Sequence, residues 1–342
     1  MHKITYLYKY PLILSLNMKS ITLKLLGCVA LSFIFAIASH AQSVSSTPVG
    51  YVTQTISAGT GTGSSLTVFG LPLYSPSSSG SVTSASGSTL TDDSAAFGNL
   101  ADASTPYSLK VSSGTLQGSY FPIVSNTATT VTVTGDLSNL SASDTYELVE
   151  VDTLSSLFGN PSAGVIYGGS STNESDIVWV LTSSGTWSRY FNDGTNWRRI
   201  ARGNPISDNY ALAPDSGVLI QRYNANASSF VITGTVPSGQ SVAGLSSSGL
   251  SIFMNTFPVD ITLSQSGIQN ATEFSSSDLV YSLTASGTWS KYFHDGSNWR
   301  RQARGNPISD DVVIASGSGV LILKASPASS STTITTALPY TL

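Results

Sequence analysis

Two stretches of the chain carry a dense set of side chains that are able to bind ligands. Gly185–Asp208 reads GTWSRYFNDGTNWRRIARGNPISD, and Gly287–Asp310 reads GTWSKYFHDGSNWRRQARGNPISD. Trp and Tyr rings offer flat faces that suit sugar rings, and Arg side chains suit hydroxyl and carboxylate groups. A glycan-binding hypothesis therefore uses one face of each stretch. Its candidate residues are Trp187, Tyr190, Trp197 and Arg202, with Trp289, Tyr292, Trp299 and Arg304 in the second stretch.

The same stretches also have a structural interpretation, because Asp-Gly between aromatic runs predicts a hairpin turn. A two-residue turn would place Arg189 opposite Arg198, and like charges in that position repel. A three-residue turn with Gly194 left-handed would instead place Arg189 opposite Trp197, where a cation–ring contact contributes ~0.5–2 kcal/mol. We prefer the second register, which sets Trp187 and Trp197 on one face and Tyr190 on the other. The structural hairpin residues are Arg189, Asp193, Gly194 and Arg199, with Lys291, Asp295, Gly296 and Arg301.

Residues for other chemistry are scarce. His294 is the only histidine after residue 42, and that part of the chain has no cysteine. The first stretch has Asn192 at the equivalent position, so the inventory excludes a Ser/His/Asp site in both copies and a multi-histidine metal site. An enzyme acting on polysaccharide would need two carboxylates about 5–10 Å apart, and Glu147, Glu150 and Asp152 are near one another in sequence. The sequence favours a non-catalytic protein without metal or cofactor.

The two stretches belong to an internal repeat. Ser175–Arg222 aligns without a gap to Ser277–Lys324 at an offset of 102, and about two thirds of the positions are identical. Ten of the 11 Lys and Arg residues after residue 42 lie in these copies, and the other is Lys110. The 19 acidic residues give residues 43–342 a formal net charge of −8. This charge argues against nucleic acid as a partner.

The composition indicates an all-β protein. Only 10% of the residues are charged, Ser, Thr and Gly are abundant, and apolar residues occur in short runs. Strands are expected at Val49–Ile56, in a hairpin within Ser119–Thr134, and at Asp144–Val151, Phe230–Val236 and Asp260–Leu263. We expect an acidic Ser/Thr/Gly-rich β domain over 42–151. Two tandem antiparallel modules, sandwich-like or barrel-like, should follow over 152–240 and 241–342.

Residues 1–41 read as an N-terminal extension and a signal peptide. A start at Met18 is followed by Lys19, Lys24 and the apolar run Leu25–Ala38, with cleavage expected after Ala41. That run is shorter than the ~20 residues of a membrane span, so a retained anchor is the weaker alternative. Lipidation at Cys28 is a further alternative, but the apolar residues that follow it argue against it. The expected location is extracellular, at the cell surface or periplasmic.

Three segments carry a resemblance to a known family. PVGYVTQTI, SYFPIVSNTATTVTV and the paired GTWS, DG and NWRR motifs resemble an uncharacterised family of exported β-rich bacterial proteins of verrucomicrobial type. The resemblance covers nearly the whole chain after the signal peptide. It implies export, a β-rich fold and a bacterial source, and it brings no substrate or site residue.

The leading functional expectation is an exported, non-catalytic structural or adhesive protein, because repeats multiply weak contacts. Its partners would be further copies of itself, other surface proteins or polysaccharide, with no integral membrane span after signal removal. The alternative is a glycan-binding module that uses the Trp/Tyr/Arg face of each repeat. The third hypothesis is a polysaccharide-acting enzyme with a carboxylate pair.

Overall fold

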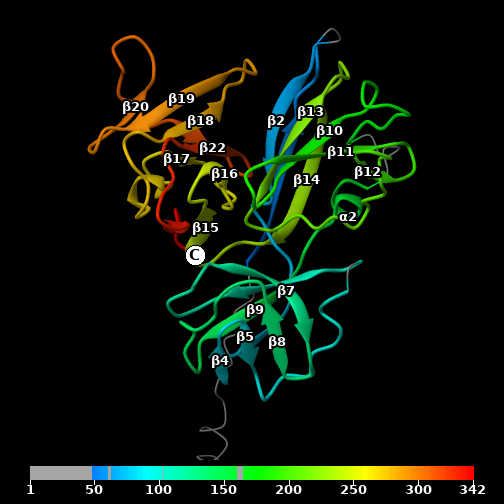
Figure 1. The fold of residues 1–342 in the computed structure, drawn as a ribbon, viewed down its shortest axis with the longest axis vertical. Coiled ribbons are helices and arrows are strands. Elements are labelled where there is room, and N and C mark those ends of the chain that lie inside the picture. Colours follow the sequence, from blue (N-terminus) through cyan, green and yellow to red (C-terminus); the bar gives the residue numbers. More distant parts are fainter. Residues whose placement is uncertain (1–47, 61–62, 103, 160–164) are drawn as a thin grey trace, which may run out of the picture. The chain divides into compact units, whose positions relative to one another are not determined.

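The computed structural model describes residues 48–60, 63–102, 104–159 and 165–342, so the expected signal peptide lies outside the described residues. The all-β prediction is confirmed (Figure 1), and every strand pairing within these ranges is antiparallel. The helical segments of the described ranges are the short α2 (Leu154–Phe158) and η2 (Ile268–Asn270). No helix within these ranges is long and apolar enough to cross a membrane.

A seven-stranded sheet in the order β3-β9-β6-β7-β8-β5-β4 forms the acidic region. Its strands are β3 (Pro76–Ser81), β4 (Ser84–Ser86), β5 (Thr89–Thr91), β6 (Tyr107–Val111), β7 (Tyr120–Asn126), β8 (Thr130–Val133) and β9 (Thr145–Glu150). The expected hairpin forms from β7 and β8, and its turn is closed by a hydrogen bond from Thr127 N to Thr130 O. Alternate residues such as Val131 and Val133 are buried in one core with Leu109 and Leu148.

The first repeat forms a five-stranded sheet in the order β12-β11-β10-β13-β2. The strands are β2 (Ser65–Gly70), β10 (Ile177–Leu181), β11 (Trp187–Asn192), β12 (Trp197–Arg199) and β13 (Gly217–Arg222). A separate pair, β1 (Val49–Ile56) and β14 (Ser228–Thr235), packs on the same core through Ile56 and Ile232. Helix α2 adds Phe158 to this core, and the reciprocal Thr153–Ser156 capping box fixes its start.

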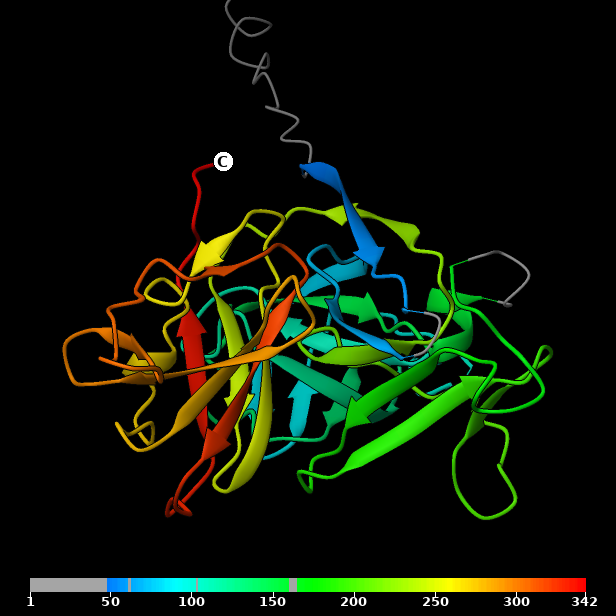
Figure 2. The same cartoon turned by 90° about the horizontal axis from the view of Figure 1, so that it is seen from above.

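The second repeat forms a matching sheet in the order β16-β22-β18-β19-β20. The colours of its strands run from yellow to orange-red in Figure 2. The strands are β16 (Gly249–Met254), β18 (Leu279–Leu283), β19 (Trp289–His294), β20 (Trp299–Arg301) and β22 (Gly319–Lys324). Two smaller pairs complete it: β15 (Ser241–Leu245) with β23 (Thr332–Thr336), and β17 (Ile261–Thr262) with β21 (Val313–Ile314). The four repeated strands keep the register of the first copy at the offset of 102.

The repeat extends further than the sequence alignment indicates. Strand β2 flanks β13 as β16 flanks β22, and β1 pairs with β14 as β15 pairs with β23. Residues 49–70 therefore belong to the sheets of the first module, and the seven-stranded sheet is inserted between β2 and β10. The expectation of one domain over 42–151 is therefore wrong at its start, because β1 and β2 pair with strands of the first repeat. The similar segments SSLTVFG (64–70) and SGLSIFM (248–254) are too short to reveal the insertion by themselves.

A buried ion pair joins the same two strands in each repeat. Arg222 at the end of β13 has 0% exposure and donates to Asp176, just before β10, with an Nη2–Oδ2 distance of 2.7 Å. At the equivalent positions, Lys324 Nζ lies 2.8 Å from Asp278 Oδ2. The pairs tie the first strand of the repeated segment to the last. Losing one partner would leave an uncompensated charge inside the module.

The two five-stranded sheets contact each other through equivalent strands. Strand β2 contacts β22 and β13 contacts β16, so the contact repeats with the roles exchanged, as at a two-fold interface. Met254 of β16 is buried there, and a methyl group built on Gly70, Gly217 or Gly319 would overlap with it. Gly70 occupies the β2 position equivalent to Met254, so this contact accommodates one methionine and requires glycines around it.

We predict that Gly217→Ala lowers the free energy of unfolding by about 1–3 kcal/mol, because its methyl group overpacks against Met254. The measurement is urea denaturation of both proteins. Combining Gly217→Ala with Met254→Ala should cost less than the sum of the two single changes, because the shortened side chain makes room. The control Gly244→Ala meets open space and should stay within about 1 kcal/mol of wild type. Equal losses in Gly217→Ala and Gly244→Ala would contradict the close packing.

Candidate functional site

The hairpin turns of the two repeats are four-residue loops, so both registers considered from the sequence are wrong. Asn192 pairs with Trp197, and Asp193 N donates to Asn196 O at 3.0 Å. The Asp193 carboxylate explains the longer loop, because its Oδ1 accepts from the N–H groups of Thr195 and Asn196 at 2.9 and 2.8 Å. Gly194 is left-handed as expected, with φ of 98°. The second copy repeats this loop around Asp295.

The expected contact between Arg189 and Trp197 is absent, and a different cation–ring contact takes its place. Arg189 lies over the ring of Trp179, its cross-strand partner on β10, at 5.1 Å. In the second copy both members differ, yet the contact persists: Lys291 lies over Tyr281 at 5.5 Å. The sequence signal for this pairing was the aromatic residue inside each preceding strand, and the turn-based reasoning missed it.

Carboxylates and arginines lock each loop from within. Arg198 binds the Asp193 carboxylate, and the equivalent Arg300 Nε lies 2.6 Å from Asp295 Oδ2. The backbone N–H groups of Trp197 and Trp299 donate to Asp208 and Asp310, each at 2.6 Å. Asp193 therefore has the structural role in the hairpin that the sequence predicts, and Asp208 caps the strand that follows the turn.

Four of the eight candidate ligand-binding residues lie inside the modules. Trp197 is 1% exposed and Trp299 is 0% exposed, and Tyr190 and Tyr292 are buried beside them. Trp197 packs on Phe158 with ring centroids 5.8 Å apart. A buried ring cannot stack on a sugar, so the glycan platform expected on each hairpin does not form.

Trp187 lies on the opposite sheet face from Trp197, contrary to expectation. The observed register differs from the preferred one by an odd number of residues, which moves every side chain of β12 to the other face. Trp187 lies on the face of the first sheet that points away from the core of its module. Trp289 lies at the equivalent position of the second sheet. Both rings are half-buried and line one cleft of about 350 Å³ together with Trp179, Leu219 and Leu321.

The remaining two candidates, Arg202 and Arg304, are exposed on the loops that follow β12 and β20. The nearby Ile206 and Ile308 are 59% and 58% exposed. The exposed cations of the two repeats are Arg189, Arg199 and Arg202, with Lys291, Arg301 and Arg304. Arg199 and Arg301 also donate to the Ser188 and Ser290 hydroxyl groups at 3.4 and 3.2 Å.

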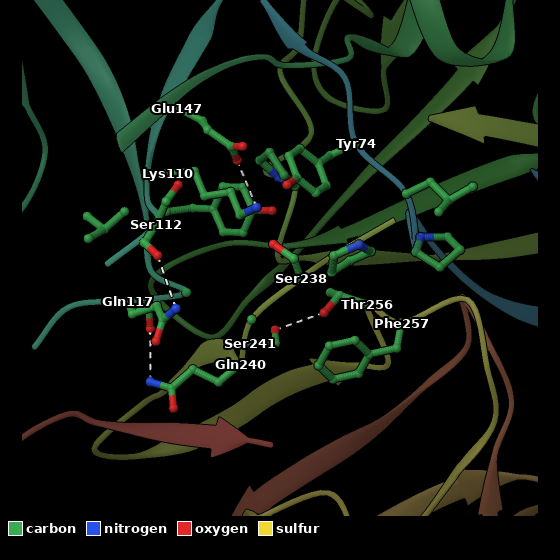
Figure 3. Close-up of a pocket in the computed structure, with 18 of the residues that line it drawn as sticks. Tyr74, Lys110, Ser112, Gln117, Glu147, Ser238, Gln240, Ser241, Thr256 and Phe257 are labelled. Carbon is green, nitrogen blue, oxygen red and sulfur yellow. Dashed lines mark hydrogen bonds and ion pairs between the residues drawn. The ribbon is translucent and has the colours of Figure 1, made fainter. Parts of the chain in front are cut away.

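A polar cluster that sequence reasoning missed lines a small cavity of about 60 Å³ (Figure 3). Lys110 Nζ lies 2.9 Å from Glu147 Oε2 and 3.5 Å from the centre of the Tyr74 ring. Burial lowers the pKa of Lys110, and the Glu147 carboxylate opposes this effect. Burial and Glu147 raise the pKa of Tyr74. Lys110, Glu147 and Tyr74 come from β6, β9 and the segment after β2, so only the fold brings them together.

The three carboxylates considered for catalysis do not share one site. Glu147 binds Lys110, whereas Glu150 and Asp152 line a separate cleft of about 380 Å³. Asp152 Oδ1 accepts from Ser156 Oγ at 2.9 Å, close to the start of α2, which suits a structural role. Within the described ranges, no group of three or more His, Cys, Asp or Glu side chains is arranged to hold a metal ion.

We predict that the turn carboxylates add acid sensitivity. The Asn196 N–H group and Arg198 hold the pKa of Asp193 at about 2, and the Asn298 N–H group and Arg300 lower the pKa of Asp295. A carboxylate with a depressed folded pKa stabilises above its unfolded pKa of about 4, and this stabilisation disappears as the pH falls toward 2. The fall in melting temperature over this range should be shallower in Asp193→Asn/Asp295→Asn. A slope equal to wild type would contradict this role, and the exposed Asp93→Asn is the control.

We predict that Glu147→Gln destabilises the protein by roughly 1–3 kcal/mol, because it leaves the largely buried Lys110 without its charge partner. Chemical denaturation at neutral pH measures the loss. Glu150→Gln, an exposed position on the same strand, is the matched control and should change stability by less than about 0.5 kcal/mol. A similar stability for both variants would show that the Lys110–Glu147 pair contributes nothing.

Comparison with known protein families, curated proteins and solved structures finds no match for this chain. The resemblance to exported β-rich bacterial proteins therefore stays a prediction. The function has to be inferred from the side chains and their surroundings.

Proposed function

We propose that this protein is an exported, non-catalytic structural and adhesive protein of the cell surface or extracellular space, which assembles with copies of itself. The observation that supports this proposal is which of the side chains shared by the two repeats are buried and which are exposed. Trp197, Trp299, Asp193 and Asp295 hold the hairpins together, whereas an array of cations and the pair Ile206 and Ile308 are left exposed in both repeats. Duplicated arrays suit a protein that forms several weak contacts at once.

The cations of the chain are segregated, whereas the carboxylates are not, because residues 152–342 hold 12 carboxylates beside ten cations. Residues 76–151 hold seven carboxylates and one cation, Lys110, which is already paired with Glu147. The exposed acids of this region are Asp93, Asp102, Asp136 and Glu150. The six exposed cations lie on the repeats instead. Surfaces of opposite charge on one molecule favour contacts that join different faces of neighbouring copies. Such head-to-tail contacts can continue from copy to copy into a filament.

The exposed loops that follow β12 and β20 support a role in contacting a partner. Both copies read ARGNPISD, at 201–208 and 303–310, although about a third of the aligned repeat positions differ. Asn204 and Asn306 have φ of 41° and 40°, so part of this identity maintains the loop. Maintenance of the loop does not explain why Arg202 and Ile206 are the same in both copies. Their side chains are exposed, and Arg202 makes no hydrogen bond or ion pair among the described residues. Contact with a partner is a reason to retain such residues.

We predict salt-dependent self-association of the purified protein. Sedimentation velocity at about 50 mM salt should show oligomers that dissociate at about 500 mM, because salt screens exposed charges. Arg202→Glu/Arg304→Glu should weaken association at least about tenfold at low salt. Ser183→Glu/Ala285→Glu adds negative charge to another loop of each repeat and should have little effect. A monomer at every salt concentration, or equal loss in both variants, would overturn this assembly.

A further inference from the structure

The contact between the two repeats leaves an aromatic cleft open. Met254, Val68 and Leu219 fill the interior of the contact, and half-buried rings surround them. Trp187 and Trp289 occupy equivalent positions in the two repeats, and both line the same cleft of about 350 Å³. This volume lies at the low end of the ~300–1,000 Å³ typical of small-molecule sites. The first repeat contributes Trp179 and Trp187 and the second contributes Trp289, so the site exists only where both repeats meet.

The third ring of the cleft is held by a network that orders its wall. Trp179 meets Trp187 edge to face, with centroids 6.4 Å apart and an interplanar angle of 81°. Trp179 Nε1 donates to Gln221 Oε1 at 3.0 Å, and Gln221 Nε2 donates to the Ser64 and Tyr223 hydroxyl groups, each at 2.9 Å. The wall formed by Trp179 is therefore in place before a ligand arrives, which reduces the entropy lost on binding.

The polar surroundings distinguish this cleft from a purely apolar one. The indole N–H groups of Trp187 and Trp289 donate to no acceptor among the described residues. A second cleft, of about 560 Å³, adjoins the first and shares Ser64, Leu66 and Gly287 with it. Ser and Thr hydroxyl groups from both repeats line the second cleft, among them Thr53, Thr55 and Thr67 from the first and Thr284, Ser286 and Ser318 from the second.

Cations lie beside the aromatic wall. Arg189 is exposed and lies over Trp179 at 5.1 Å, and Lys291 lies over Tyr281 on the second sheet at 5.5 Å. Neither cation forms an ion pair within the part of the chain that the structure describes. Each therefore retains donors for a carboxylate or sulfate group of a ligand.

We propose that the cleft between the repeats binds one acidic oligosaccharide per chain. The apolar faces of pyranose rings stack on Trp187 and Trp289, and the sugar hydroxyl groups meet the hydroxyl-lined cleft. Arg189 and Lys291 bind the carboxylate or sulfate groups of the sugar. This site goes beyond the proposed self-assembly, which uses the Arg202 and Arg304 loops. It also replaces two binding faces, one on each repeat, with a single shared site.

The test is isothermal titration of the purified protein with hexasaccharides of galacturonate, of mannuronate and of heparin, with cellohexaose as the neutral counterpart. At least one acidic hexasaccharide should bind saturably with one site per chain, and at least tenfold more tightly than cellohexaose. Trp187→Leu and Trp289→Leu should each weaken binding at least tenfold, because they keep apolar packing but remove the flat ring. Tyr51→Leu, on exposed β1 outside the cleft, should leave the affinity unchanged.

Two further measurements keep the outcome unambiguous. In the wild-type protein, the bound hexasaccharide should protect Trp187 and Trp289 from oxidation by N-bromosuccinimide. Peptide mass spectrometry locates the oxidised residues. This measurement needs no variant, so it does not depend on whether a variant folds. Arg202→Glu/Arg304→Glu should retain binding, which separates this site from self-assembly. No saturable binding of any acidic hexasaccharide, two sites per chain, or affinity unchanged by both tryptophan substitutions would overturn the proposal.

Discussion

The architecture of each repeat depends on the burial of one tryptophan, Trp197 in the first copy and Trp299 in the second. Truncating a buried ring of this size typically costs about 3–5 kcal/mol, which is a large part of the stability of a domain. Burial of the ring draws the three-residue strand that carries it onto the core, and Asp208 or Asp310 accepts the backbone N–H group at that position. The indole of Trp197 donates to Gly159 O, whereas that of Trp299 has no acceptor in the described ranges. Apolar packing is therefore the common requirement.

The remaining features of the hairpin follow from this burial. With Trp197 facing inward, the register places Trp187 on the outer face, where it meets the other repeat. The loop that returns from β12 leaves Arg202 and Ile206 in solvent. One motif thus supplies a core residue, a residue of the contact between repeats and an exposed loop. The buried Arg222–Asp176 pair and its Lys324–Asp278 equivalent then join the first and last strands of each repeat.

Local patterns predicted much of the fold. Alternating β-branched and aromatic runs located β1 and the β7–β8 hairpin, and Asp-Gly located the turns at Gly194 and Gly296. The register could not be predicted in the same way, because it depends on how the Asp193 carboxylate caps the loop and on which face meets the core. The Lys110–Glu147 cluster and the pairing of β1 with β14 join residues far apart in sequence. No local pattern carries that information. The sequence could not divide the candidate residues between core and surface, because that division depends on the fold.

The central claim is that the five tryptophans divide into two buried structural rings and three rings at the open cleft. Fluorine NMR of protein labelled with 5-fluorotryptophan tests this division directly, with resonances assigned by single Trp→Phe variants. The resonances of Trp197 and Trp299 should not shift when H₂O is exchanged for D₂O, whereas those of Trp179, Trp187 and Trp289 should shift. A solvent shift at Trp197 or Trp299 would contradict the claim, because the doubled motif would then present its ring to solvent rather than to a core.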